Sequence, residues 1–166
     1  MAVIEAIETV YLEADAASVT FSSIPATYEH LQLRINARTT TSSNFENTQV
    51  IFNGVTTSTY HRHTMYALGT TLAIFNLTSQ PSITGPLNAG SGLDAAYYGM
   101  IVMDILDYRN ANKNTTILFN SSASAASYSQ WGSGMWDDTA AVTSITLTTA
   151  TYVRGSEFTL YGLTDS

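Results

Sequence analysis

The sequence contains no cysteine, a single lysine (Lys113) and few charged residues of either sign. Without cysteine there can be no disulfide framework and no thiolate metal site, which fits assembly in a reducing cytoplasm. Charged residues make up 11% of the chain, although mixed charges usually keep free monomers apart and lysine often protects exposed sheet edges. The composition therefore predicts a surface that partner subunits partly cover. A charge-poor extracellular domain is the alternative.

Basic residues are too few and too scattered to form a nucleic-acid-binding surface, which needs clustered Lys and Arg. The net charge is −7. The first residues, MAVIEAIETVYLEAD, include acids and no basic n-region, so we expect no signal peptide, and no apolar run is long enough to span a membrane. We therefore expect neither nucleic acid nor a membrane as a partner. The six basic residues are Arg34, Arg38, Arg62, Arg109, Lys113 and Arg154.

Helical patterns are also missing, because no window keeps an i, i+3, i+4, i+7 apolar stripe with caps. Short strand-like runs recur instead, with turn residues between them. At 166 residues the chain is long enough for one full hydrophobic core. We predict an all-β, single-domain antiparallel β-sandwich over residues 1–166, jelly-roll-like in form. The expected strands are residues 3–12, 18–24, 30–38, 49–52, 59–66, 70–77, 97–108, 115–121, 142–149 and 157–163.

The segment FSSIPATYEHLQLRINAR (21–38) has the clearest pattern. After a proline turn, apolar and polar residues alternate, which is typical of a strand with one buried and one solvated face. Arg34 and Arg38 fall on the solvated face, where their planar guanidinium groups could pair with acidic groups of a neighbouring protein. The expected buried residues are Leu31, Leu33, Ile35 and Ala37, and the solvated ones are His30, Gln32, Arg34, Asn36 and Arg38.

Four connections carry further expectations. Asn53-Gly54 predicts a tight type I′ hairpin, because both residues tolerate positive φ. Residues 79–96, which contain two of the three prolines, predict an ordered excursion over the surface of the sandwich. The strongly apolar run 97–108 predicts a central strand, and the small residues of 122–134 predict a flexible stretch.

Residues suited to chemistry are present, but their patterns do not favour catalysis. His61 and His63 would lie on one face of a strand, without the third or fourth ligand that a zinc site needs. The acids Asp104, Asp107, Asp137 and Asp138 suit turns and strand ends better than a glycosidase pair or a calcium loop. No G-x-S-x-G elbow occurs, and Gly90-Ser91-Gly92 lacks the phosphate-loop fingerprint. We expect no enzymatic activity, no cofactor and no bound metal.

Aromatic residues form the one group that could bind a partner. Tryptophan and tyrosine on loops anchor protein interfaces and also stack on sugars. Core packing of one or both tryptophans, contact between subunits and sugar binding all remain open at this point. We take Trp131 and Trp136, with Arg34 and Arg38, as candidate interface residues. The whole group is Tyr97, Tyr98, Tyr128, Trp131 and Trp136.

Several segments, in order along nearly the whole chain, resemble a family of small virion structural proteins of tailed bacteriophages, of the cyanophage and marine type. Family members often carry several lysines and a charged strand where this chain has Ile51-Phe52-Asn53. The matching segments are FSSIPATYEHLQLRINAR at 21–38, VIFNG at 50–54, DILDYRNANKNTT at 104–116, a tryptophan followed by AAVTSITLTTA within 136–150, and GSEFTLYGL at 155–163.

This resemblance implies a non-enzymatic β-sandwich on the particle surface, made in the host cytoplasm. The chain has no coiled-coil arm that would attach it to a tail. We therefore expect a capsid decoration or cement protein, a homotrimer that binds the major capsid protein or other virion proteins. The alternative is a tail fibre or adhesin module that binds host surface carbohydrate.

Overall fold

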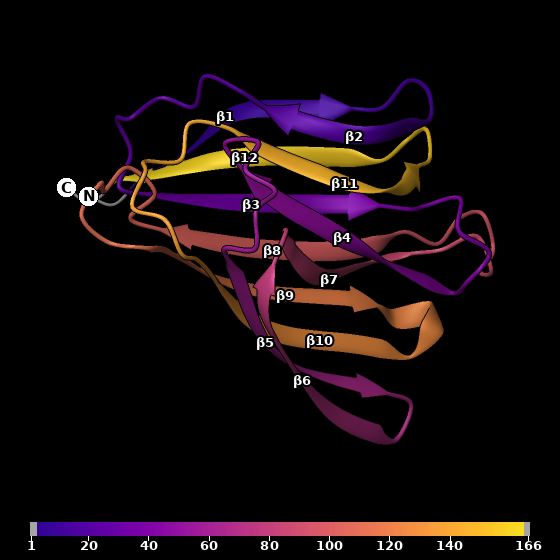
Figure 1. Cartoon of the computed structure of the whole chain (residues 1–166). Helices are drawn as coiled ribbons and strands as arrows, with labels where there is room; N and C mark the ends of the chain where they lie inside the picture. The colour runs from indigo at the N-terminus through magenta and orange to yellow at the C-terminus, as the bar shows by residue number, and fades with distance from the viewer. Residues whose placement is uncertain (1–2, 165–166) are drawn as a thin grey trace.

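The computed structural model, which describes residues 3–164, consists of two antiparallel sheets packed face to face (Figure 1). The larger sheet has eight strands in the order β1-β12-β3-β8-β9-β10-β5-β6, and the smaller has four in the order β2-β11-β4-β7. The described residues contain no α-helix, only the 3-10 turn Ser124–Ala126. The expected all-β sandwich is confirmed. No helix among these residues is long and apolar enough to cross a membrane.

The twelve strands follow the sequence patterns closely in the first third of the chain and near its end. Their bounds are β1 Val3–Tyr11, β2 Ala16–Phe21, β3 His30–Ala37, β4 Phe45–Phe52, β5 Tyr60–Leu68, β6 Thr71–Gln80, β7 Ile83–Ala89, β8 Gly99–Leu106, β9 Thr115–Ala123, β10 Tyr128–Trp136, β11 Ile145–Tyr152 and β12 Glu157–Thr164.

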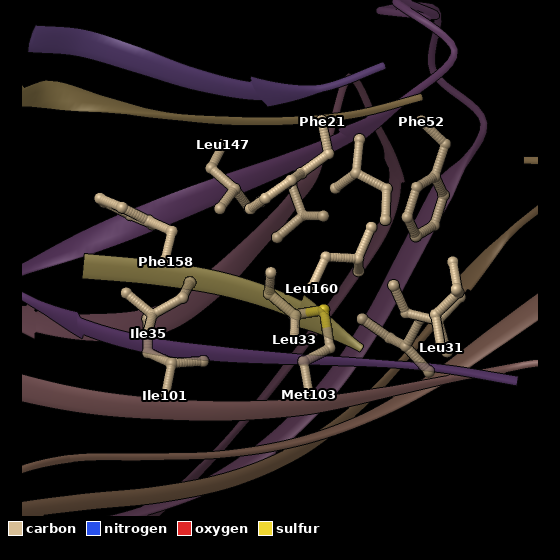
Figure 2. Close-up of a cluster of buried hydrophobic side chains, with 14 of the residues drawn as sticks. Phe21, Leu31, Leu33, Ile35, Phe52, Ile101, Met103, Leu147, Phe158 and Leu160 are labelled. Atoms are coloured by element: carbon tan, nitrogen blue, oxygen red, sulfur yellow. The ribbon is translucent and has the colours of Figure 1, made fainter. Parts of the chain in front are cut away.

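Strand β3 has the predicted alternation and supplies the centre of the core. Its apolar side chains point between the sheets, while Arg34 and Asn36 are exposed on the other face. Burial of such side chains is the main favourable contribution to folding, roughly 1.5–3 kcal/mol each. Figure 2 shows Leu31, Leu33 and Ile35 meeting side chains from both sheets. The labelled partners are Phe21, Phe52, Ile101, Met103, Leu147, Phe158 and Leu160.

Strands β9, β10, β5 and β6 extend the larger sheet past β8, and β9, β10 and β5 still contact β7 of the smaller sheet. In Figure 1 the β5–β6 hairpin lies at the lower end of the sheet, furthest from β2. We call the face of the larger sheet that packs toward the smaller sheet its inner face, and the opposite face its outer face. The extension therefore leaves β6 as an edge strand with a long solvent-exposed surface.

The Asn53-Gly54 turn forms, but the predicted hairpin is wrong. Both residues have positive φ (52° and 70°), and the amide of Val55 donates to the carbonyl of Phe52 over 2.9 Å. However, β4 pairs with β7 and β11, whereas β5 pairs with β6 and β10, so the chain crosses between sheets here. The Tyr60 hydroxyl accepts the amide of Phe52 over 2.9 Å and donates to the carbonyl of Phe52 over 3.3 Å, and these bonds hold the crossing in place.

The surface excursion predicted for residues 79–96 is wrong in its first half. Strand β6 continues to Gln80, and Ile83–Ala89 forms strand β7 at the edge of the smaller sheet. The sequence did not indicate this strand because it contains Pro86, and proline lacks the amide hydrogen that a strand donates to its neighbour in a sheet. An edge strand tolerates proline, since one side of its backbone has no partner strand.

The flexible stretch predicted for residues 122–134 is also wrong, because most of it forms strand β10 at an interior position of the sheet. Its glycines allow close packing. A Cβ atom at Gly132 would lie 2.3 Å from Cζ of Phe119 and 2.4 Å from Cγ2 of Thr64. Gly132 therefore leaves the space into which these two side chains fold from the neighbouring strands. By contrast, residues 97–108 contain the central strand β8, as predicted.

Candidate functional site

The outer face of the larger sheet carries an apolar surface centred on Trp131. Trp131 pairs with Met65 on β5 and with Asn120 on β9, and Met65 pairs in turn with Ile74 on β6. Ile74 is 64% exposed and Trp131 46%. Apolar groups gathered in this way mark interaction sites more often than single exposed residues do. We call this surface the outer patch: Met65, Leu72, Ile74, Val102, Leu118 and Trp131.

The middle of the outer patch is a shallow depression with a volume of about 610 Å³. Apolar side chains form most of its floor, and polar groups stand around Trp131. The polar lining residues are His63, Asp104, Asn120 and Ser133. The depression can thus accept either an apolar side chain of a protein partner or a flat ring with hydroxyl groups at its edge.

Arg34 lies on the same outer face as Trp131, as the alternation of β3 predicts. The pairings Arg34–Val102 and Val102–Asn120 place Arg34 three strand spacings from Trp131, about 14 Å. Its Nε donates to Gln32 over 2.8 Å, and its guanidinium lies 4.9 Å from the ring centroid of Tyr161. The group is exposed and makes no ion pair within residues 3–164, so it can meet an acidic partner.

Arg38 is not on a solvated face, which corrects the sequence interpretation. It is 6% exposed, and its guanidinium donates to three backbone carbonyls of residues 93–97. The acceptors are Leu93 at 2.7 Å, Asp94 at 2.8 Å and Tyr97 at 3.1 Å. The period of two ends with β3 at Ala37, and the segment before β8 folds over the next side chain. Arg38 therefore holds this segment in place and does not present its charge to a partner.

Trp136 is also wrong as a surface candidate, because it is completely buried. Its ring centroid lies 5.7 Å from that of Phe52 and 6.2 Å from that of Tyr60, which it stacks against. Trp131 and Trp136 are five residues apart on one strand, and strand alternation places them on opposite faces of the sheet. The proposed aromatic group is thus divided between the outer patch and the core.

The three tyrosines of that group do not join Trp131. Tyr128 is 6% exposed on the inner face of β10, and burial raises its pKa to about 12. Tyr97 is exposed in the segment that Arg38 holds, and the Tyr98 hydroxyl donates to the carbonyl of Arg154 over 3.0 Å. Only Trp131 therefore remains as an aromatic of the outer patch.

The histidines and acids occupy structural positions. Both His61 and His63 lie on the outer face of β5, and no third His, Cys, Asp or Glu joins them among residues 3–164 to hold a metal ion. Asp107 pairs with Lys113, which holds the pKa of that carboxyl below its usual value. Asp138 accepts the amide of Ala140 over 2.8 Å within a turn.

Arg62 is the residue whose importance the sequence interpretation missed. It stands between His61 and His63 in the chain, yet strand alternation places its side chain on the inner face, away from theirs. It alone of the six basic residues makes no side-chain hydrogen bond or ion pair within residues 3–164, and its buried Nε has no acceptor. The sequence could have indicated this, because successive side chains of a strand point to opposite faces, so Arg62 must face away from His61 and His63.

Comparison with models of known protein families gives no match. Comparison with curated protein sequences gives none either.

Proposed function

We propose that the chain is a non-enzymatic structural protein of a tailed-bacteriophage particle that binds the assembled capsid and bridges neighbouring capsomers. The observation that carries this proposal is the outer patch, which continues onto the uncharged edge strand β6, whose outer edge has no partner strand among residues 3–164. The resemblance of the sequence to small virion structural proteins supports the same function. The major capsid protein is the partner that we propose for this surface.

The edge strand β6 lacks two features that normally protect a sheet edge, namely charged residues and proline. Its sequence, TLAIFNLTSQ, contains no charged residue and no proline. Leu72 is 63% exposed and Phe75 50%, and these two side chains point to opposite faces. Natural monomers protect such edges with lysine, proline or a covering segment. An exposed edge of this kind favours a protein partner.

Charge also favours docking at this end of the molecule. Residues 47–93 contain no Asp or Glu, and Arg62 is their only Lys or Arg, although the chain as a whole has a net charge of −7. An acidic partner can therefore approach the β5–β6 hairpin with little repulsion, and Arg34 can pair with its carboxylates.

The strand order also supports the jelly-roll architecture that we propose for the sandwich. When the pairs β5–β6 and β9–β10 are set aside, the remaining eight strands form the orders β1-β12-β3-β8 and β2-β11-β4-β7. Four pairs are then nested along the chain: β1–β12, β2–β11, β3–β8 and β4–β7. Eight strands in two such sheets are typical of a jelly roll. The two inserted pairs build the extension that carries the outer patch.

The docking proposal predicts that Ile74→Lys lowers the occupancy of the protein on purified particles at least tenfold. A lysine in the middle of β6 introduces a desolvation cost for any partner that covers this edge. Arg34→Ala is expected to lower the occupancy less, because it removes one exposed charge contact. Occupancy is measured by quantitative gel analysis of sedimented particles.

The matched control for this experiment is Thr20→Lys, which adds the same charge at an exposed position of β2 on the smaller sheet. Its occupancy should equal that of the wild type. Normal occupancy of Ile74→Lys would rule out docking through β6. Thermal unfolding of each variant separates lost docking from lost folding.

We propose a trimer as the assembled form, in which β6 of each copy stays free to meet the capsid. Head-to-tail contacts between copies close into rings, whereas pairing of β6 with itself gives a two-fold dimer. Because the chain has no cysteine, Ile74→Cys provides a direct test. We expect a mass of three chains by light scattering and no disulfide-linked dimer after mild oxidation. An efficient dimer cross-link would contradict the ring.

A second candidate function is binding of host surface carbohydrate by a tail module. The observation that favours it is the depression at Trp131, where an exposed indole lies beside Asn120 and Ser133. A glycan array with the soluble protein tests this function. Micromolar binding that Trp131→Ala abolishes, together with absence of the protein from purified capsids, would replace the capsid proposal.

A further inference from the structure

A second concave site lies on the inner face of the sheet extension, where it opens beside the smaller sheet. It is a cleft of about 270 Å³ between β5, β6 and β10 on one side and β4 and β7 on the other. We call it the Arg62 cleft. Its lining includes Phe45, Arg62, Tyr66, Phe75, Tyr128 and Gln130.

Arg62 brings an uncompensated positive charge into this cleft. Its side chain crosses directly over Gly85 of β7: a Cβ atom there would lie 2.4 Å from Nη1 and 2.9 Å from Cδ of Arg62. Partial burial lowers the pKa of the guanidinium, and the nearby phenol of Tyr128 opposes this effect. A half-buried cation usually has an anionic partner, since desolvation of an unpaired charge costs free energy. Within residues 3–164 no carboxylate fills this role.

Gln130 provides a second, independent sign of a missing ligand. The residue is only 3% exposed, and no group among the described residues donates a hydrogen bond to its Oε1. Gln130 also lines the cleft. Buried amide oxygens are almost always paired, because an unpaired acceptor costs about 1–3 kcal/mol. A ligand that carries both an anionic group and a hydroxyl could satisfy Arg62 and Gln130 together.

The remaining wall is aromatic and continuous. Tyr66 stacks on Phe75 at 5.5 Å and on Tyr128 at 5.2 Å between ring centroids, and Phe45 lies 4.7 Å from Tyr128. Such a wall accepts the apolar face of a sugar ring. The volume of the cleft suits one such ring, since it lies just below the range of drug-sized pockets, about 300–1,000 Å³.

We propose that the Arg62 cleft binds an acidic monosaccharide unit of the hexuronic acid class. Its carboxylate pairs with the Arg62 guanidinium, a ring hydroxyl donates to Gln130 Oε1, and the ring packs on the aromatic wall at Tyr66. This site is separate from the outer patch and does not depend on where the protein sits on the particle. A bound acidic sugar would give the protein an affinity for acidic polysaccharide.

The test is a titration of the ¹⁵N-labelled full chain with sodium glucuronate, followed by NMR. We expect the Arg62 Nε–H resonance and the amides of the cleft to shift in a saturable way. Glucose, which has the same ring without the carboxylate, should bind at least tenfold more weakly. Acetate, which has the carboxylate without the ring, should also bind at least tenfold more weakly.

Arg62→Gln removes the charge and leaves a shorter polar side chain, and we expect it to weaken glucuronate binding at least tenfold. Arg154→Gln removes an exposed arginine that pairs with Glu13 and does not line the cleft, so it is the matched control and should bind as the wild type does. If Arg62→Gln does not fold, the resonance of the wild-type Arg62 side chain still reports binding. The absence of any shift with glucuronate would overturn the proposal. Equal binding of acetate, or binding only of an acidic peptide, would overturn the sugar assignment.

Discussion

Replacing Trp136 with alanine is expected to lower the free energy of unfolding by about 3–5 kcal/mol. The side chain is fully buried between Phe52 and Tyr60, so the substitution leaves a large cavity where the two sheets meet. Its indole Nε1 has no hydrogen-bond partner among the described residues, so its loss leaves no protein acceptor unpaired. The predicted cost therefore comes from packing. Urea denaturation followed by circular dichroism measures it.

Trp131→Ala is the matched control, since it removes the same side chain from the same strand at an exposed position. We expect it to change the free energy of unfolding by no more than about 1 kcal/mol. Equal destabilisation by the two substitutions would show that the two faces of β10 are assigned wrongly. The pair thus tests the placement of the outer patch as well as that of the core.

Arg38→Met is expected to lower the free energy of unfolding by about 2–4 kcal/mol, because a hydrogen bond to a charged group is worth about 1.5–3 kcal/mol and the bonds of one side chain do not add fully. Methionine keeps much of the apolar volume but leaves the carbonyls of Leu93 and Tyr97 without the Arg38 donor, whereas the carbonyl of Asp94 keeps the amide of Tyr97. Residues 93–97 should then open locally. Hydrogen exchange of this segment, together with denaturation, measures both effects.

Arg34→Met is the control for Arg38→Met, since the two arginines are four residues apart and differ chiefly in burial. We expect it to change the stability by about 0.5 kcal/mol or less, as is usual for surface substitutions. If Arg34→Met were the more damaging of the two, Arg38 would not be the group that holds residues 93–97.

The parts of the fold with simple alternation could be predicted from the sequence. Strand β3 alternates because one face meets the core and the other meets solvent, and β8 reads as central because it is strongly apolar. Strands β7 and β10 could not be predicted, because Pro86 and the glycines of β10 normally indicate loops. Pro86 is tolerated because β7 is an edge strand, and the glycines of β10 are tolerated because bulky side chains of neighbouring strands fill the space beside them. Both conditions depend on the tertiary structure, so no local sequence pattern shows them.

The candidate site was predictable to a similar degree. Arg34 and Trp131 are exposed, as interface residues must be, whereas Arg38 and Trp136 are buried. Arg38 follows the last residue of its strand, so the period of two no longer determines its surroundings. The Arg62 cleft depends on how far the larger sheet extends past the smaller one, which no local pattern encodes.

The position of β12 has a consequence for how the chain folds. This strand lies between β1 and β3, although it is the last of the twelve described strands in chain order. Until it arrives, β1 has no partner in its sheet and one side of β3 stays open. Completion of the larger sheet must therefore wait until β12 has been synthesised, and such long-range pairing is slow, on the order of milliseconds to seconds. A nascent chain with open apolar strands needs protection from its copies during that interval, most of all where many copies are made at once.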